Sequence, residues 1–324
     1  MNTNLNTVIP NDVLRGCNVI VRDCAGLKRY DTVTVISDYA TRDIGKFITT
    51  VAGSITQNVV HHIIDPFSVH GQEPPDNVAL QMCKSDVVFG VTKMSMAHTQ
   101  ARLKASQNGA KYLSLPDYSI DVLTNEALLI DFKSITPLSI YLAELLTEGD
   151  KITLWTEAGT DLECNIKDRI ANPAPGWCYT KGSIASPPNA ETNIALFEND
   201  SNGVLVVDGS VTCREIGLLQ NPLTLTIENG SVVKVDGEKS DLLNNIFNSI
   251  GNPAARVVAE FGIGLNPQAK LCGKMLLDEG CLGTVHIGIG SNSTIGGNNK
   301  VPFHVDNVIR YSTVSINKET IMND

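Results

Sequence analysis

Two histidines in the C-terminal part of the chain have neighbours that commonly share a metal ion with imidazole. His286 lies in an apolar stretch that runs into Gly288 and Gly290, and His304 is followed two residues later by Asp306. On an extended segment, residues two apart point to the same face about 7 Å apart, so the side chains of His304 and Asp306 can converge on one ion. Imidazole and carboxylate together suit divalent zinc, cobalt, manganese or iron. The pattern therefore predicts a metal site in this half of the chain.

Two glutamates could complete such a site. Glu260 ends the apolar run 256–260 and is followed by Phe-Gly-Ile-Gly. A carboxylate in an apolar strand is costly unless it is paired or bound to a metal, so Glu260 is expected at the site. Glu191 follows a Pro-Pro-Asn-Ala loop, and its position alone favours an exposed loop glutamate.

The glycine-rich stretches, two further histidines and the cysteines have structural interpretations rather than catalytic ones. The glycine-rich stretches 262–264 and 288–297 match neither the GxGxxG nor the GxxxxGK[ST] pattern, so we interpret them as close backbone approaches around a site. His61 and His62 lie inside an apolar strand and are expected to be structural. The eight cysteines form no CxxC pair or catalytic signature, which favours reduced thiols.

Composition limits the classes of function. The chain has 324 residues, a net charge of -10 and an isoelectric point near 5.1, and such an acidic protein would repel a phosphate backbone. We therefore expect no nucleic-acid partner. The first ten residues lack a basic start and an apolar core, and no stretch reaches 18 apolar residues. We expect a cytoplasmic protein without a membrane partner.

The elements of the first half alternate in type. Strands are expected at 31–36, 59–64, 86–91 and 112–115, with helices at 40–51, 78–83 and 97–106 between them. Strand and helix alternating at this spacing predict a parallel sheet with crossover helices. We therefore expect a Rossmann-like α/β domain over 1–150.

The second half is richer in strands. Two strands flank Asn229-Gly230, a strong hairpin signal. Further strands are expected at 256–261, 283–289 and 308–316, and residues 171–190 are expected to form a long loop. These elements predict a mixed α+β metal-binding, catalytic domain over 151–324.

Several segments, in this order, resemble the leucyl aminopeptidase T (family M29) superfamily. The resemblance covers most of the chain in patches. The segments that carry the resemblance are Ser95-Met-Ala-His-Thr-Gln-Ala-Arg102, Thr160-Asp-Leu, Asn189-Ala-Glu-Thr-Asn, the run 259–267, which begins with Ala-Glu-Phe-Gly, His286-Ile-Gly-Ile-Gly-Ser-Asn and His304-Val-Asp306.

The resemblance implies a set of metal ligands. By motif, Glu191 and Glu260 fall on the two metal-binding glutamates of the peptidases, His286 and His304 on the histidines, and Asp306 on the aspartate. The peptidases' tyrosine ligand is expected seven residues after the first histidine, where this chain has Ser293. A hydroxyl is a poor ligand until it is deprotonated, so we do not expect Ser293 to bind metal.

The same superfamily includes enzymes similar to 2,5-dihydroxypyridine dioxygenase, which hold one non-haem iron with two histidines and a carboxylate. The missing tyrosine and the retained segment 288–297 favour that branch. In it, His98 of the Ala-His-Thr motif could serve as an acid or base. An equally good interpretation of His98 is a helix N-terminal residue that binds backbone.

The sequence leaves three functions open. The first is a metal-dependent aminopeptidase with zinc, cobalt or manganese, a peptide substrate, and Glu191 or Glu260 moving the proton. The second is an Fe(II) ring-cleaving dioxygenase acting on a small aromatic such as a dihydroxypyridine. The third is a binding protein or biosynthetic enzyme on the same scaffold. The first is our main expectation, and the resemblance implies a homodimer.

Overall fold

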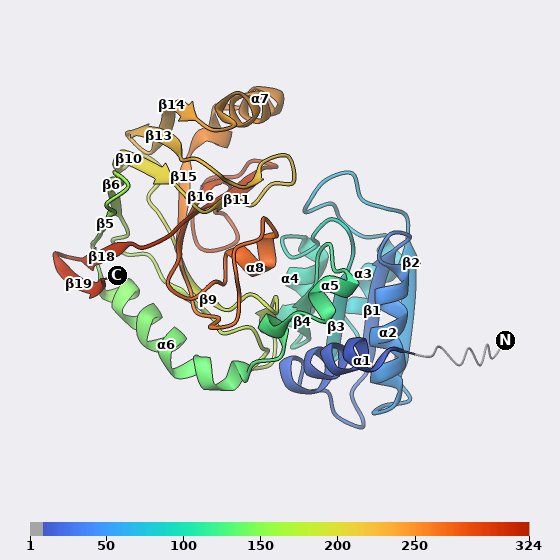
Figure 1. Cartoon of the computed structure of the whole chain (residues 1–324). Coiled ribbons are helices and arrows are strands. Elements are labelled where there is room, and N and C mark those ends of the chain that lie inside the picture. Colours follow the sequence, from blue (N-terminus) through green and yellow to red (C-terminus); the bar gives the residue numbers. More distant parts are fainter. Residues whose placement is uncertain (1–8, 324) are drawn as a thin grey trace. The chain divides into compact units, whose positions relative to one another are not determined.

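The computed structural model describes residues 9–323, which fall into two compact units (Figure 1). The first unit comprises the chain up to Phe132 together with 176–187, and the second comprises 133–175 and 188–324. Whether 1–150 and 151–324 fold as independent domains stays a prediction. Within 9–323, no helix is both long and apolar enough to cross a bilayer.

The first unit is built on a parallel sheet with strand order β2-β1-β3-β4-β8. Every residue of β1 and β3 is buried, as expected for strands that have helices on both faces of their sheet. The parallel α/β prediction is thus confirmed. The strands are β1 (Val33–Asp38), β2 (Val59–Ile64), β3 (Val87–Val91), β4 (Lys111–Ser114) and β8 (Ile184–Ala185).

Some of the helical segments of this unit begin at a side-chain cap or directly after a proline. Thr99 caps α4 by accepting a hydrogen bond from the Arg102 backbone N–H, so this helix begins at Gln100 rather than at 97. The helical segments are α1 (Asn11–Asn18), the π-helix η1 (Val19–Cys24), α2 (Arg42–Gly53), α3 (Asp76–Met82), α4 (Gln100–Gln107), α5 (Ile120–Leu123) and the 3₁₀ turn η2 (Glu126–Leu128).

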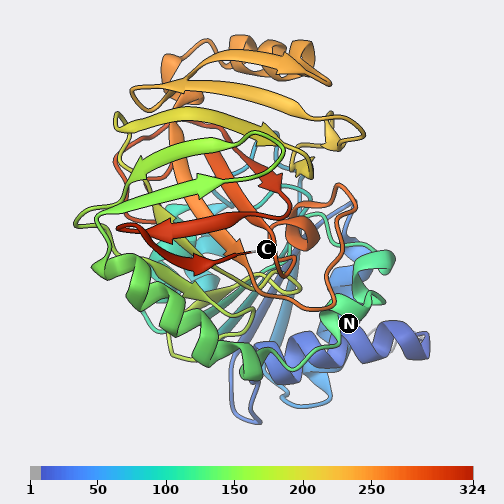
Figure 2. The same cartoon turned by 60° about the vertical axis from the view of Figure 1, so that its left-hand side comes forward.

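The second unit holds two seven-stranded antiparallel sheets. In the first of them, neighbouring strands follow the order β14-β13-β10-β6-β5-β18-β19, which can be followed in Figure 2. Buried and partly exposed residues alternate along β13, so one face of this sheet packs inward. The strands are β5 (Lys151–Trp155), β6 (Asp161–Asn165), β10 (Ser201–Val207), β13 (Leu223–Glu228), β14 (Ser231–Gly237), β18 (Thr313–Ile316) and β19 (Glu319–Met322).

The other sheet has the strand order β12-β11-β17-β16-β15-β9-β7, and it contains the predicted metal ligands. Strands β9, β15 and β16 are buried along their whole length. The strands are β7 (Asn172–Ala174), β9 (Glu191–Ala195), β11 (Ser210–Val211), β12 (Gly217–Leu218), β15 (Val258–Gly264), β16 (Val285–Gly290) and β17 (His304–Ile309). The helical segments of the unit are α6 (Phe132–Glu148, whose first residue belongs to the first unit), α7 (Ser240–Ile250), η3 (Pro253–Arg256) and α8 (Met275–Asp278).

Local chemistry explains where expectations held and failed. Asn229 and Gly230 both have positive φ and join β13 to β14, which confirms the predicted hairpin. The single strand expected at 308–316 is wrong, because Tyr311 adopts positive φ and separates β17 from β18. The loop expected at 171–190 also contains two short strands, β7 and β8.

Candidate metal centre

Four neighbouring strands bring the five predicted ligand residues to one face of a sheet. Glu191 begins β9, Glu260 lies in β15, His286 in β16, and His304 and Asp306 in β17. The strands are adjacent in the order β17-β16-β15-β9. Residues that are far apart in the sequence therefore become neighbours through antiparallel pairing.

The strand register puts these side chains on a common face. Asp306 pairs with Gly288, and Gly288 pairs with Glu260. Because side chains alternate along a strand, His304 shares the face of Asp306, and His286 shares the face of Gly288. The opposite face carries apolar residues such as Ile287, which supply the core under the site.

A β-bulge at Ala259 decides the direction of Glu260. Val258 pairs with Ile289, yet Glu260 pairs with Gly288, so two steps along β15 match one step along β16. If the pairing of Val258 with Ile289 continued in regular register without the bulge, Glu260 would pair with Ile287 and lie on the apolar face. Bulges are common next to active sites, where they redirect a side chain in this way.

Two glycines, Gly262 and Gly288, leave room on the sheet for the side chains of the predicted ligands. A Cβ on Gly262 would lie 2.1 Å from Nε2 of His286. A Cβ on Gly288 would lie 2.7 Å from His304 Cε1 and 3.0 Å from Asp306 Oδ1. Any larger residue would displace the ligands, so the glycines do mark close approaches around a site, as the sequence suggested.

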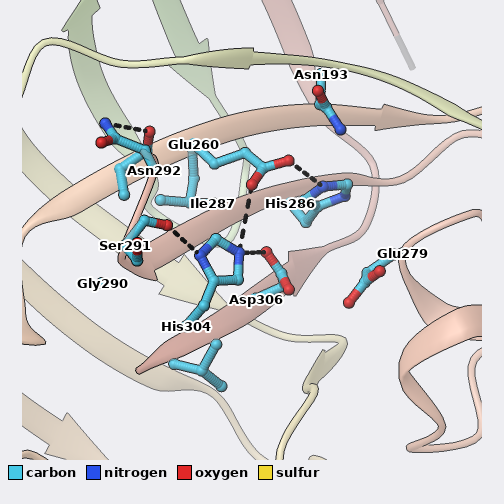
Figure 3. Close-up of polar contacts among 12 residues, drawn as sticks. Asn193, Glu260, Glu279, His286, Ile287, Gly290, Ser291, Asn292, His304 and Asp306 are labelled. Atoms are coloured by element: carbon cyan, nitrogen blue, oxygen red, sulfur yellow. Dashed lines mark hydrogen bonds and ion pairs between the residues drawn. The ribbon is translucent and has the colours of Figure 1, made fainter. Parts of the chain in front are cut away.

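The polar atoms form two groups that share Glu260 (Figure 3). In one group, Nε2 of His286 lies 3.5 Å from Glu191 Oε2 and 4.0 Å from Glu260 Oε1. In the other, Nε2 of His304 lies 3.1 Å from Asp306 Oδ1 and 3.3 Å from Glu260 Oε2. Each group offers ligand atoms within 4.8 Å of one another, a spacing suited to one divalent ion.

The carboxylates make both histidines strongly basic. Burial alone would lower the pKa of His286, but contacts with Glu260 and Glu191 raise it to about 9. For His304, burial is likewise outweighed, and Asp306 and Glu260 raise the pKa to about 10. The metal-free site therefore holds protons where a metal would bind.

Glu191 and Asp306 differ in the direction of their pKa shifts. Burial raises the pKa of Glu191, and the charge of His286 opposes that rise only in part. Asp306 is buried too, but the neighbouring His304 holds the pKa of Asp306 well below its usual range. Asp306 is thus the more strongly ionised of the two, which suits a metal ligand.

Outer hydrogen bonds fix the direction of the inner side chains. The Asn193 side chain donates to Glu191 Oε1 at 2.7 Å. The Asp306 backbone N–H donates to the Thr212 hydroxyl at 3.0 Å, which ties β11 to this part of β17. On the far side of the ring from its acidic partners, Nδ1 of His304 lies 2.8 Å from the Ser291 carbonyl oxygen. An Nδ1–H that donates to this carbonyl leaves Nε2 free to bind metal.

Glu279, just after α8, is a further acid that the sequence did not reveal. It is 9% exposed, and Figure 3 shows its carboxylate turned towards Asp306. Burial, followed by the charges of Asp306 and Glu191, raises the pKa of Glu279 well above its usual range. Asn189 donates a long 3.4 Å hydrogen bond to it. No local sequence signal marks it, because its neighbours Asn189 and Asp306 lie far away along the chain.

Two other predicted positions do not join these groups. Ser293 is exposed, and its hydroxyl lies 3.3 Å from that of Ser291. His98 is an exposed residue of the first unit in the turn before α4, and its role as an acid or base stays a prediction. His61 contacts the Ser37 hydroxyl at 2.8 Å, and its pKa is lowered to about 4 by burial and by His62.

The residues present fit a divalent metal. Glu191 Oε2 is a buried oxygen for which the described residues supply no hydrogen-bond donor, and it faces Nε2 of His286. Such an acceptor is costly unless a cation or a proton occupies the space in front of it. Two imidazoles and several carboxylates are also the ligand types that iron, zinc and manganese accept.

Comparisons with known proteins identify the family. A family model described as NicX, 2,5-dihydroxypyridine 5,6-dioxygenase, matches residues 19–324. The curated 2,5-dihydroxypyridine 5,6-dioxygenase of Pseudomonas putida KT2440 is 22% identical over 189 residues, covering 55% of this chain and 54% of that protein. The match thus spans about half the length of this relative.

Two solved structures share the fold. The 2,5-dihydroxypyridine dioxygenase of Pseudomonas putida KT2440 superposes with a TM-score of 0.85 at 17% identity, covering 98% of this chain and 97% of that one. AmpT from Thermus thermophilus superposes with a TM-score of 0.70 at 13% identity, covering 96% and 98%. The resemblance to the aminopeptidase T superfamily is therefore a resemblance of fold.

The main functional expectation from the sequence, a metal-dependent aminopeptidase, is wrong. The motifs that suggested it predict metal ligands, and neither ligands nor fold decide the reaction. The family match selects the ring-cleaving branch instead. With residues 19–324 matched, the chain belongs to the NicX, 2,5-dihydroxypyridine 5,6-dioxygenase, family.

Proposed function

We propose that this protein is a mononuclear non-haem Fe(II) dioxygenase that opens the ring of a small dihydroxypyridine-like aromatic. The observation that carries the proposal is the pair His286 and His304 set around Glu260 on one sheet face, in a chain of this family. Two imidazoles and one carboxylate are the ligand set of many Fe(II) oxygenases, which keep other positions of the metal open.

Either of two carboxylates can complete the ligand set with the histidines. Asp306 is the strongly ionised acid and contacts His304, whereas Glu260 lies near both rings. Bound Fe(II) would supply the one-electron chemistry that lets dioxygen react with a closed-shell ring. A dioxygenase places both oxygen atoms in its product, so the reaction needs no external reductant.

The remaining acids can manage the substrate's protons. A ring hydroxyl becomes more electron-rich when it loses its proton, and Glu191 Oε2 is a buried acceptor without a hydrogen-bond donor among the described residues. The raised pKa of Glu191 makes it a better base than an ordinary glutamate. His98 remains the alternative acid or base from the first unit.

The acidic side chains of the site suit an aromatic substrate that carries hydrogen-bond donors. Four carboxylic side chains surround the two histidines: Glu191, Glu260, Glu279 and Asp306. Ring hydroxyls and a ring N–H are neutral donors, and carboxylate oxygens accept hydrogen bonds from them.

Oxygen uptake tests the proposal. We expect anaerobically purified, Fe(II)-loaded protein to consume one dioxygen per 2,5-dihydroxypyridine, with the zinc-loaded protein inactive. His304→Ala should lose iron and activity together, whereas His62→Ala, in a strand of the first unit, should keep both. No uptake by fully iron-loaded protein across dihydroxypyridines and catechols would contradict the proposal.

A further inference from the structure

His304 depends on the Ser291 carbonyl for its orientation. Its side chain is 31% exposed, whereas that of His286 is 1% exposed, so packing holds the His304 ring less tightly. The ring is set by its contact of 2.8 Å with the Ser291 carbonyl and by its two acidic neighbours. Whatever fixes Ser291 therefore fixes the nitrogen that faces the metal.

Asn292 fixes this carbonyl from the adjacent position. Its side chain is fully buried, and its Oδ1 accepts the backbone N–H of Asn299 at 2.9 Å. Its own N–H donates to the Asn299 carbonyl at 3.1 Å, which closes the loop between β16 and β17. A Cβ on Gly297 would lie 2.0 Å from Asn292 Cγ, so the loop folds directly onto this amide.

The same amide reaches the bulge that directs Glu260. Nδ2 of Asn292 lies 3.2 Å from the Ala259 carbonyl and 3.2 Å from the Leu196 carbonyl. Ala259 is the extra residue of the β15 bulge. One buried side chain thus holds both the turn that orients His304 and the backbone step that turns Glu260 into the site.

A buried ion pair holds the loop from outside. Glu198 accepts hydrogen bonds from the Asn292 side chain at 3.1 Å and from the Asn298 backbone N–H at 2.6 Å. Its other oxygen pairs with Arg169 at 2.8 Å, and Arg169 also donates to the Gly296 carbonyl at 2.7 Å. Arg169 is only 8% exposed, and hydrogen bonds of this charged kind are stronger and more directional than neutral ones.

We propose that Asn292 is a positioning residue for the metal centre, and that Arg169 and Glu198 hold its loop in place. Asn292 touches none of the reacting groups and acts through Ser291 and Ala259. Outer residues that orient metal ligands typically change metal affinity by about 10–100-fold when they are removed. The inference rests on the metal-binding part of the proposed function and not on the reaction.

Replacing Asn292 tests the inference against a matched control. We expect Asn292→Ala to bind Co(II) about 10–100-fold more weakly, with an altered visible spectrum of the bound ion. Asn298→Ala, an exposed asparagine of the same loop that takes part through its backbone N–H, should behave as wild type. Unchanged Co(II) affinity and spectrum in folded Asn292→Ala would overturn the assignment.

Two further measurements cover other outcomes. If Asn292→Ala does not fold, Glu198→Ala should still show weaker Co(II) binding, and a wild-type affinity there would contradict the proposed role of the loop. In metal-free protein, ring ¹⁵N shifts report the hydrogen bond between Nδ1 of His304 and the Ser291 carbonyl. We expect Asn292→Ala to change those shifts and Asn298→Ala not to, even if wild type binds no metal and the proposed function fails.

Discussion

The histidines are the residues at which protons and metal compete. His286 and His304 have pKa values raised to about 9 and about 10, despite burial, by contacts that include Glu191, Glu260 and Asp306. At neutral pH the metal-free site is therefore protonated on both rings. An arriving ion must displace these protons before it can bind.

Metal affinity should consequently rise with pH. Below pH 9 both rings hold protons in the metal-free protein, so binding releases up to about two protons, and affinity rises by up to about a hundredfold per pH unit. The rise should level off above the pKa values of the two rings. Titration calorimetry in buffers of different ionisation enthalpy measures the released protons directly, and proton-independent binding at pH 7 would contradict this.

Glu279 makes the folding stability of the metal-free protein depend on pH. Its pKa is raised in the folded protein, chiefly by burial, so the unfolded chain loses this proton first as pH rises. The folded state then binds more protons than the unfolded one, and metal-free stability falls with rising pH until the folded pKa is passed.

Glu279→Gln should remove this loss. Glutamine keeps the shape and stays neutral, so we expect the variant to melt above wild type at pH 8 and near wild type at pH 5. Melting curves of metal-free protein at both pH values check the prediction. A difference that is equal at the two pH values would show that ionisation of Glu279 is not its cause.

At the scale of elements, the sequence predicted strands and turns that have a clear local pattern, and it missed elements that lack one. The β-branched runs at 31–36 and 86–91 and the Asn229-Gly230 turn carry their own local signals, and these predicted strands and a hairpin. Helix α6 was missed because Pro137 lies inside it, and proline normally kinks or breaks a helix interior. The Ala259 bulge has no local signal, since only pairing with β16 defines it.

The sheet also predicts which glycines cannot change. In Gly262→Ala the new methyl would overlap Nε2 of His286, so we expect weak metal binding and a loss of about 1–3 kcal/mol in stability. Gly53→Ala is the control, because a Cβ there meets no atom within 4 Å. Metal titration and thermal melting of both variants check this, and normal metal binding by Gly262→Ala would contradict the proposed position of His286.

For the whole molecule, the sequence predicted which side chains lie together better than it predicted the reaction. His286, His304, Asp306 and Glu260 were selected by residue type and flanking pattern, and the structure brings them together. Glu191 was placed by family resemblance alone, because its loop context indicated an exposed residue, yet it is 8% exposed. Glu279 was missed because its neighbours lie far away in the sequence. The homodimer remains a prediction.

The Ala259 bulge lets Val258 and Glu260, which are two residues apart, lie on opposite faces of the sheet. The composition of β15 would be almost unchanged by losing one residue between Val258 and Glu260, and the strand would still pair with β16. Val258 would then pair with Ile289 and Glu260 with Gly288 in a regular ladder, so both side chains would keep their faces. Related chains with and without this extra residue would therefore both keep the acid in the site, whereas a chain that kept the residue but paired it without a bulge would turn either Val258 or Glu260 to the other face.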